Sequence, residues 1–164
     1  MTFQVLDALI LTPIAAAIVI ALVPNRRAEL HLPLGITLSM VPLALAGWLF
    51  FAFDKGVSGY QFVHDSPWYE PWGMSWHVGV DGISLALIAL TALLGPISLA
   101  ASTAIKDRTK LFVVFMLLLE AGLIGVFVSL DLILFFLFFE VVLVPMYFII
   151  GVWGGERRIY AAYK

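Results

Sequence analysis

The chain has 164 residues, of which 63% are hydrophobic and 12% are charged, and its mean hydropathy is +1.07. Soluble domains average about 45–50% apolar and about 25% charged residues, and one of this size has too little interior to bury so much apolar surface. The composition therefore indicates a membrane protein. Because there is no cysteine, disulfides, thiolate metal sites and iron–sulfur ligation are excluded, and the three scattered histidines form no metal- or haem-binding pattern.

Five apolar stretches predict membrane-spanning helices, at residues 6–23, 32–53, 83–101, 111–128 and 132–152. About 20 helical residues cross the ~30 Å hydrocarbon layer, and peptide groups in lipid must be hydrogen-bonded within their own segment. The first stretch has neither a basic start nor a small-residue cleavage site, so it is expected to be a true span. The predicted fold class is all-α, a polytopic transmembrane helix bundle.

The distribution of positive charge predicts the orientation of the chain. Eight basic residues follow the first, third and fifth spans, whereas Lys55 alone lies on the other side: the eight are Arg26, Arg27, Lys106, Arg108, Lys110, Arg157, Arg158 and Lys164. Connections rich in Lys and Arg stay in the cytoplasm or its equivalent. The N-terminus is therefore expected outside.

The long connection 54–79 is then external, and its aromatic sequence contains YQFVHDSPWYEPWGMSWHVG. Short alternating runs around a Pro/Gly centre predict a β-hairpin on the membrane surface, with Trp68, Tyr69, Trp72 and Trp76 at the level of the lipid headgroups. A plain interfacial anchor is the simpler interpretation of the same aromatic residues.

Glu140 is the one ionisable residue of the run FFLFFEVVLVPMYF. Eight residues of its span precede it, which places it about 12 Å below the outer edge at ~1.5 Å per residue. A carboxylate there costs at least about 2.5 kcal/mol, so we interpret Glu140 as a functional residue. The alternative is a protonated, hydrogen-bonded group that only holds helices together.

Two prolines predict helix breaks near this site. Pro145 has no N–H for the carbonyl of Val141, so a kink and a free carbonyl are expected beside Glu140. Pro96 would likewise free the carbonyl of Ala92 in the third span.

A second intramembrane acid, Glu120, lies in the fourth span. The short connection Ser129–Asp131 predicts an antiparallel pair of spans, and counting from it puts Glu120 and Glu140 at nearly equal depth. The sequence leaves open whether their faces meet. If they do, like-charge repulsion and desolvation would let the pair hold or pass a proton. Gly122 and Gly125 would allow close helix packing.

Asp81 and Asp131 each precede a span. Carboxylates at these positions accept backbone N–H bonds and favour the helix dipole, so both are interpreted as N-caps with a structural role.

The stretches HVGVDGISLALIALTALLGPISLAAS (77–102) and SLDLILFFLFFEVVLVPMYFIIGVWGGERRIYAAYK (129–164) carry a family resemblance. They resemble the antiporter-like membrane subunits of NADH–quinone oxidoreductase, respiratory complex I, of the subunit M or chain 4 type. The resemblance implies a proton-translocating subunit of the membrane arm, in which Glu140 matches a glutamate that pairs with a lysine on a later helix. It also implies that residues 1–164 are the N-terminal part of one larger transmembrane domain.

The same resemblance implies that this chain holds no cofactor itself, because NADH, FMN, iron–sulfur clusters and quinone would be bound by other subunits. The expected partners are those membrane-arm subunits and the lipid bilayer, with no nucleic acid, in a bacterial inner membrane. A related subunit of a multisubunit Na⁺/H⁺ antiporter or membrane-bound hydrogenase is the first alternative. A non-transporting membrane anchor or assembly protein is the second.

Overall fold

The computed structural model describes residues 5–69, 71 and 73–163. Its helices and strands are α1 (Val5–Leu22), α2 (Ala28–Ala52), β1 (Gln61–Tyr69), β2 (Met74–Val80), α3 (Gly82–Ala101), α4 (Thr109–Val128), α5 (Leu132–Trp153) and α6 (Arg158–Tyr163). Each of α1 to α5 is long and apolar enough to cross a membrane, which confirms the five predicted spans. The main difference is that α2 begins at Ala28, because its helical hydrogen bonding continues through the polar turn that contains Glu29 and His31.

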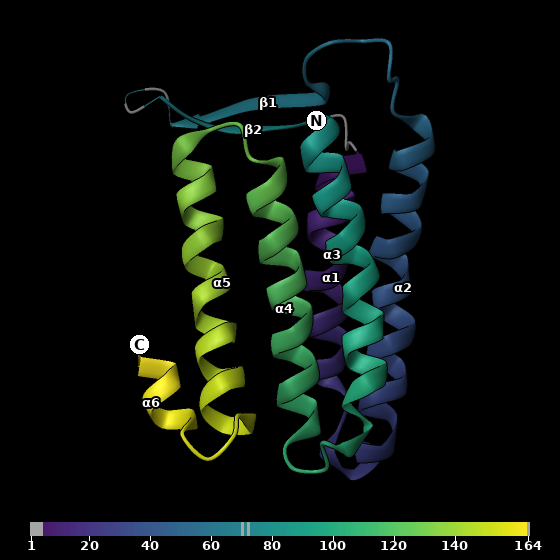
Figure 1. Ribbon diagram of the computed structural model, residues 1–164, viewed down its shortest axis with the longest axis vertical. Helices are drawn as coiled ribbons and strands as arrows, with labels where there is room; N and C mark the ends of the chain where they lie inside the picture. Colours follow the sequence, from purple (N-terminus) through teal and green to yellow (C-terminus); the bar gives the residue numbers. More distant parts are fainter. Residues whose placement is uncertain (1–4, 70, 72, 164) are drawn as a thin grey trace.

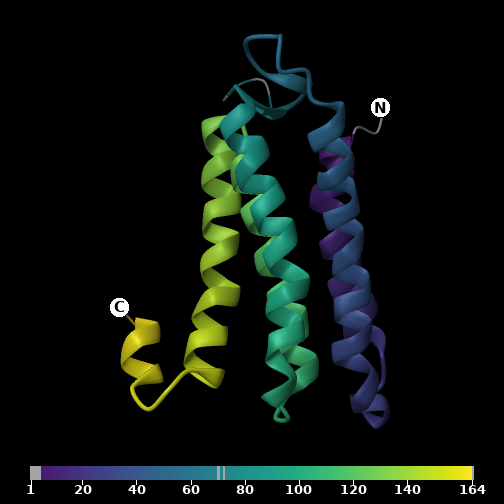
Figure 2. The same ribbon diagram turned by 45° about the vertical axis from the view of Figure 1, so that its right-hand side comes forward.

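The five long helices run alongside one another, and α4 lies at the centre of the bundle (Figures 1 and 2). It packs against α1, α2, α3 and α5, whereas α5 lies at one side and contacts α4, α6 and β2. The two intramembrane acids therefore sit on a central and a peripheral helix.

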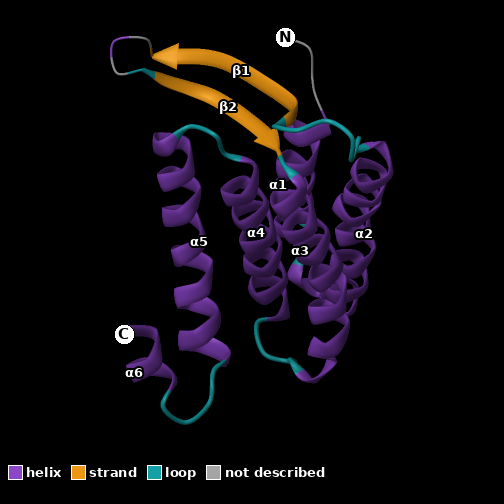
Figure 3. Cartoon of the chain, turned by 45° about the horizontal axis from the view of Figure 1, so that its top comes forward, coloured by secondary structure: helices purple, strands orange, loops and turns teal. Residues whose placement is uncertain are grey.

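The connections alternate between the two ends of the bundle. The β-hairpin and the start of α1 lie at one end (Figure 3). The connections that carry Arg26, Arg27, Lys106, Arg108 and Arg157 lie at the other. This is the arrangement that the positive-inside rule requires of the predicted orientation. Lys164 lies outside the described residues.

The predicted hairpin is present, as two antiparallel strands with His64 opposite Val78 and Ser66 opposite Trp76. Trp68 and Tyr69, which lie near the hairpin turn, are exposed, as expected for aromatic residues at a membrane interface. Trp72 lies outside the described residues. The indole of Trp76 is half-buried and packs edge-on against Phe138 of α5, with ring centroids 5.9 Å apart, so this side chain also contacts the bundle.

Polar contacts attach the hairpin to the bundle. The carboxylate of Asp7 in α1 accepts a 2.7 Å hydrogen bond from Trp76 Nε1 and lies 3.0 Å from His64 Nδ1. The backbone N–H of Leu130, in the α4–α5 connection, donates to the carbonyl of His77 at 2.8 Å. Hairpin, α1 and the α4–α5 connection are thus joined by hydrogen bonds.

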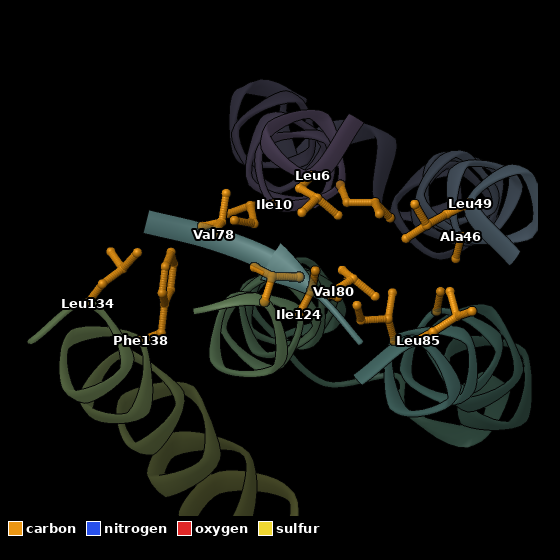
Figure 4. Close-up of a cluster of buried hydrophobic side chains, with 14 residues drawn as sticks. Leu6, Ile10, Ala46, Leu49, Val78, Val80, Leu85, Ile124, Leu134 and Phe138 are labelled. Atoms are coloured by element: carbon orange, nitrogen blue, oxygen red, sulfur yellow. The ribbon is translucent and has the colours of Figure 1, made fainter. Parts of the chain in front are cut away.

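Apolar contacts reinforce this attachment. Val78 and Val80 of β2 are fully buried in a cluster with side chains from α1 to α5 (Figure 4). Leu6 of α1 and Ile124 of α4 are among these partners. The hairpin is therefore part of the core at this end of the bundle, whereas the sequence predicted only a surface element.

Pro96 and Pro145 do not end their helices, and the kinks expected at them stay predictions. Both prolines are buried inside helices that continue without interruption, α3 and α5. A proline removes one hydrogen bond, but the turns on either side of it remain bonded, and packed neighbours support the backbone. The carbonyl of Val141 lacks the N–H donor that Pro145 cannot supply, but α5 continues on both sides of it.

Asp81 and Asp131 cap the helices that follow them. The Asp81 carboxylate accepts the N–H of Ser84 at 2.7 Å, and Asp131 accepts those of Ile133 and Leu134 at 2.8 and 2.9 Å. The hydrogen bond from the Ser84 backbone lowers the pKa of Asp81. The bond between Ser84 and Asp81 therefore stabilises the fold at pH values above the ordinary pKa of aspartate. This stabilisation is lost as the pH falls through the lowered pKa of Asp81.

We expect Trp76→Phe to loosen the hairpin, because it keeps an aromatic ring against Phe138 and removes the N–H that bonds Asp7. A hydrogen bond to a charged group contributes about 1.5–3 kcal/mol, so amide exchange in residues 61–80 should accelerate by about tenfold or more. Hydrogen–deuterium exchange measures this. The exposed Trp68→Phe is the matched control, and equal rates in the two variants would contradict the attachment.

Candidate functional site

Glu120 is buried on the face of α4 that meets α3. Its side chain is 3% exposed and lies against Gly95. A Cβ atom at position 95 would be 2.8 Å from all three atoms of the Glu120 carboxyl group, which is closer than real Cβ contacts. The carboxyl group thus occupies the space that the missing side chain of Gly95 leaves.

A cleft of about 210 Å³ lies beside this carboxyl group, lined by polar Thr91 and Ser98 of α3 and by apolar residues of both helices. Within the described part of the chain, Glu120 Oε1 has no hydrogen-bond partner. The Thr91 hydroxyl donates to the carbonyl of Leu87 at 2.9 Å, so its oxygen can accept a proton donor from the cleft. A buried carboxyl with an unsatisfied oxygen is costly, which marks Glu120 as a candidate site.

Glu140 lies on the side of α5 that faces away from the neighbouring helix α4. The side of α5 that meets α4 is formed by Phe138 against Gly125 and by Val142 against Gly122, where a Cβ would lie 2.6 Å from Val142 Cγ2. Glu140 lies two residues from each, about 200° around the helix. It is exposed, and the faces of the two acids do not meet.

The depths of the acids also differ from the expectation of near equality. The pairs 125–138 and 122–142 place residue 120 level with about residue 144, which is about four residues or ~6 Å from Glu140. The cause lies in the connection, where Ser129 pairs with Val78 of β2 and leaves the helical path. Counting residues from the connection to each acid assumes that both helices begin at equal depth, so it could not predict this difference in depth.

Glu140 lies in an exposed apolar surface. Phe136 and Val144, one turn before and after it on the same face, are 59% and 56% exposed. No ion pair of Glu140 occurs among the residues that the structure describes. Within those residues, His, Asp and Glu also form no group of three that could hold a metal ion.

Sequence reasoning did not single out Asp7, which joins α1 to His64 and Trp76 of the hairpin. The available signal was a carboxylate near the start of an apolar span, opposite a connection that contains indole and imidazole donors. These contacts arise only in the folded chain, because His64 and Trp76 lie 57 and 69 positions after Asp7 in the sequence.

We expect Gly95→Ala to destabilise the protein, because the added methyl group would collide with the Glu120 carboxyl group. Overpacking of this kind costs typically about 1–3 kcal/mol. The thermal unfolding midpoint in detergent should fall. Gly47→Ala in α2 is the matched control, since nothing lies within 4 Å of its Cβ position and alanine favours helix. A fall of equal size in both variants would contradict the close approach.

Two family models match the chain. The model described as NADH-ubiquinone oxidoreductase chain 4, amino terminus, matches residues 9–126. The model described as NADH:quinone oxidoreductase/Mrp antiporter, transmembrane, matches residues 129–164.

Similar proteins carry related names. The chain is 42% identical over 159 residues to NADH-quinone oxidoreductase subunit M of Rhodobacter capsulatus, covering 93% of this chain and 30% of that protein. It is 48% identical over 118 residues to subunit M of Rickettsia felis, covering 71% and 24%. The chain therefore spans less than a third of the length of these relatives.

Solved structures share the fold. Respiratory complex I from Thermus thermophilus contains a chain that matches with a TM-score of 0.79 at 25% identity, covering 98% of this chain and 31% of that one. An archaeal membrane-bound sulfane sulfur reductase matches with a TM-score of 0.75 at 19% identity and shows the fold alone. With the bundle, the hairpin and these matches together, the chain belongs to the NADH–quinone oxidoreductase chain 4 family of integral membrane proteins, the family that includes subunit M.

Proposed function

We propose that this chain is the N-terminal part of a proton-translocating membrane subunit of NADH–quinone oxidoreductase. The observation that carries the proposal is Glu140, a carboxyl group in the middle of a spanning helix and on its exposed face. An unpaired carboxylate facing lipid is expensive, so such a group requires a polar partner outside the residues that the structure describes. The relatives, which are about three times as long, have further chain that could supply it.

In this proposal Glu140 receives and releases a proton as its surroundings change. The resemblance supplies the partner, a lysine on a later helix, whose approach would favour the ionised carboxylate and whose withdrawal would favour the protonated one. Quinone reduction elsewhere in the complex would drive the change. NADH, FMN, iron–sulfur clusters and quinone would be bound by other subunits, so this chain would carry out no redox step itself.

Glu120 is a second, separate proton position in the proposal. Its cleft opens between α3 and α4, whereas Glu140 faces away from α4, so a proton would not pass directly from one carboxyl to the other. The polar lining of the cleft, Thr91 and Ser98, suits a water beside Glu120. The two acids would therefore serve different points on a path.

An Na⁺/H⁺ antiporter subunit is the second candidate function. The family model that covers residues 129–164 includes the Mrp antiporter in its description, and this segment contains Glu140. The segment 9–126, by contrast, matches a model described only by the oxidoreductase, which favours the oxidoreductase.

For the proposed oxidoreductase subunit, the partners would be other membrane-arm subunits, and the location would be a bacterial inner membrane.

Glu140→Gln should abolish most proton transport while the complex still assembles, because glutamine keeps the shape of the side chain but cannot ionise. Removing a proton-transfer group typically costs a hundredfold or more in the step it serves, so proton flux through this subunit should fall to about a hundredth or less. Proton uptake by inverted vesicles during NADH oxidation measures this. Unchanged flux would contradict the proposal and favour a membrane anchor.

The matched control is Val144→Leu, on the same exposed face one turn away. It changes apolar shape and leaves the carboxyl group in place, so transport and assembly should both persist. Blue-native electrophoresis of both variants separates loss of transport from loss of assembly.

Glu120→Gln should reduce proton flux by less than Glu140→Gln does, because Glu120 serves a separate position and glutamine fills the same space beside Gly95. Glu120→Asp keeps a carboxyl group and should restore part of the flux. Equal flux in the wild type and in Glu120→Gln would assign Glu120 to packing alone.

A further inference from the structure

A cavity of about 430 Å³ lies at the end of the bundle opposite the hairpin, where the α1–α2 and α3–α4 connections meet. Its polar lining is Asn25, His31, Lys106, Arg108, Thr109 and Lys110. No acidic side chain is among the described residues that line it. Asp107 and Glu29 are the nearest acids in sequence, and neither contributes to the lining. The cavity is therefore strongly basic.

One helix N-terminus adds to the positive potential. Thr109, the first residue of α4, lines the cavity, and no side chain caps this helix at Arg108. Ala28 of α2 lines the cavity as well, but α2 continues directly from a 3₁₀ turn at Asn25–Arg27, where the N–H of Arg27 bonds the carbonyl of Pro24. The uncapped start of α4 presents free N–H groups and the positive end of the helix dipole, which together bind anions.

A buried histidine also lacks a partner here. His31 is 2% exposed, and its Nε2 has no hydrogen-bond partner among the described residues. Lys110 is held in place, because its Nζ donates to the carbonyl of Val23 at 2.9 Å, which leaves further protons free. Buried polar atoms are nearly always bonded, so a group absent from the chain itself is expected at this position.

Apolar surface continues from the cavity along the bundle. Leu111, which lines it, is 48% exposed, and Leu30 beside His31 is 42% exposed. A free inorganic anion would use only the basic groups. A phospholipid would use both, with its phosphate in the cavity and its acyl chains along the apolar helix surface.

We propose that this cavity binds the phosphate of an anionic phospholipid from the leaflet on the basic side of the membrane. The lipid oxygens would accept bonds from Lys106, Arg108 and the His31 ring. The start of α4 would contribute backbone donors. Basic pockets between spanning helices on this side of a membrane suit anionic headgroups. The site is independent of proton transport, since it lies at the bundle end and involves neither intramembrane acid.

The test uses the full-length subunit in its purified complex, placed in phosphatidylcholine nanodiscs with or without phosphatidylglycerol. Lipid retained by the complex is measured by native mass spectrometry. Each basic group near a membrane surface contributes about 1 kcal/mol, which is about fivefold in affinity. Lys106→Gln with Arg108→Gln should therefore lower phosphatidylglycerol affinity by about twentyfold or more.

Arg157→Gln with Arg158→Gln is the matched control, because it removes the same charge from the same end of the bundle without touching the cavity. Equal losses in the two double variants, or no loss in the first, would overturn the site. Inorganic phosphate is the competing probe. If phosphate binds with the same dependence on Lys106 and Arg108 and phosphatidylglycerol shows no preference, the occupant is a free anion and the lipid proposal fails.

A wild-type measurement guards against variants that fail to assemble. Photoactivatable phosphatidylglycerol should crosslink to peptides that contain residues 25–31 and 106–111. Crosslinks spread evenly over all the basic connections would overturn the proposal without any substitution.

Discussion

A peptide group surrounded by hydrocarbon has no water to bond, so each spanning segment must satisfy its own backbone. In this chain that constraint produces five long helices and keeps the β-hairpin at one end of the bundle. It also explains why Pro96 and Pro145 do not divide their helices. Opening a turn further would expose more unsatisfied groups to lipid than the single bond that each proline removes.

The same constraint sorts the polar side chains. Asp7, Asp81 and Asp131 lie at helix ends, where they accept bonds from the hairpin or from free helix N–H groups. The basic residues gather at the opposite end, where the connections leave the bundle. Glu120 and Glu140 are the exceptions, in the middle of α4 and α5, and each carries a cost that its role must justify.

Sequence reasoning identified the spans, the hairpin and both caps, because these depend on local apolar length and on residues adjacent in the chain. It missed features that depend on how the helices rotate and dock. The face that Glu120 presents follows from the packing of α4 on α3 at Gly95. The depth difference between the acids follows from the pairing of Ser129 with β2, a contact between distant segments. The Asp7 contacts and the basic cavity arise in the same way.

These placements give the two carboxyl groups different physical situations. Glu120 is buried between α3 and α4, with a cleft beside its carboxyl group. Glu140 projects from α5, a helix whose outer face is lined by Phe136 and Val144 and whose inner face is occupied by α4. Any group that balances the charge of Glu140 must approach from that outer face. A change in the distance of such a group could alter the protonation of Glu140 without disturbing the α4–α5 contact, so the proton site that we propose at Glu140 could respond while the bundle stays packed.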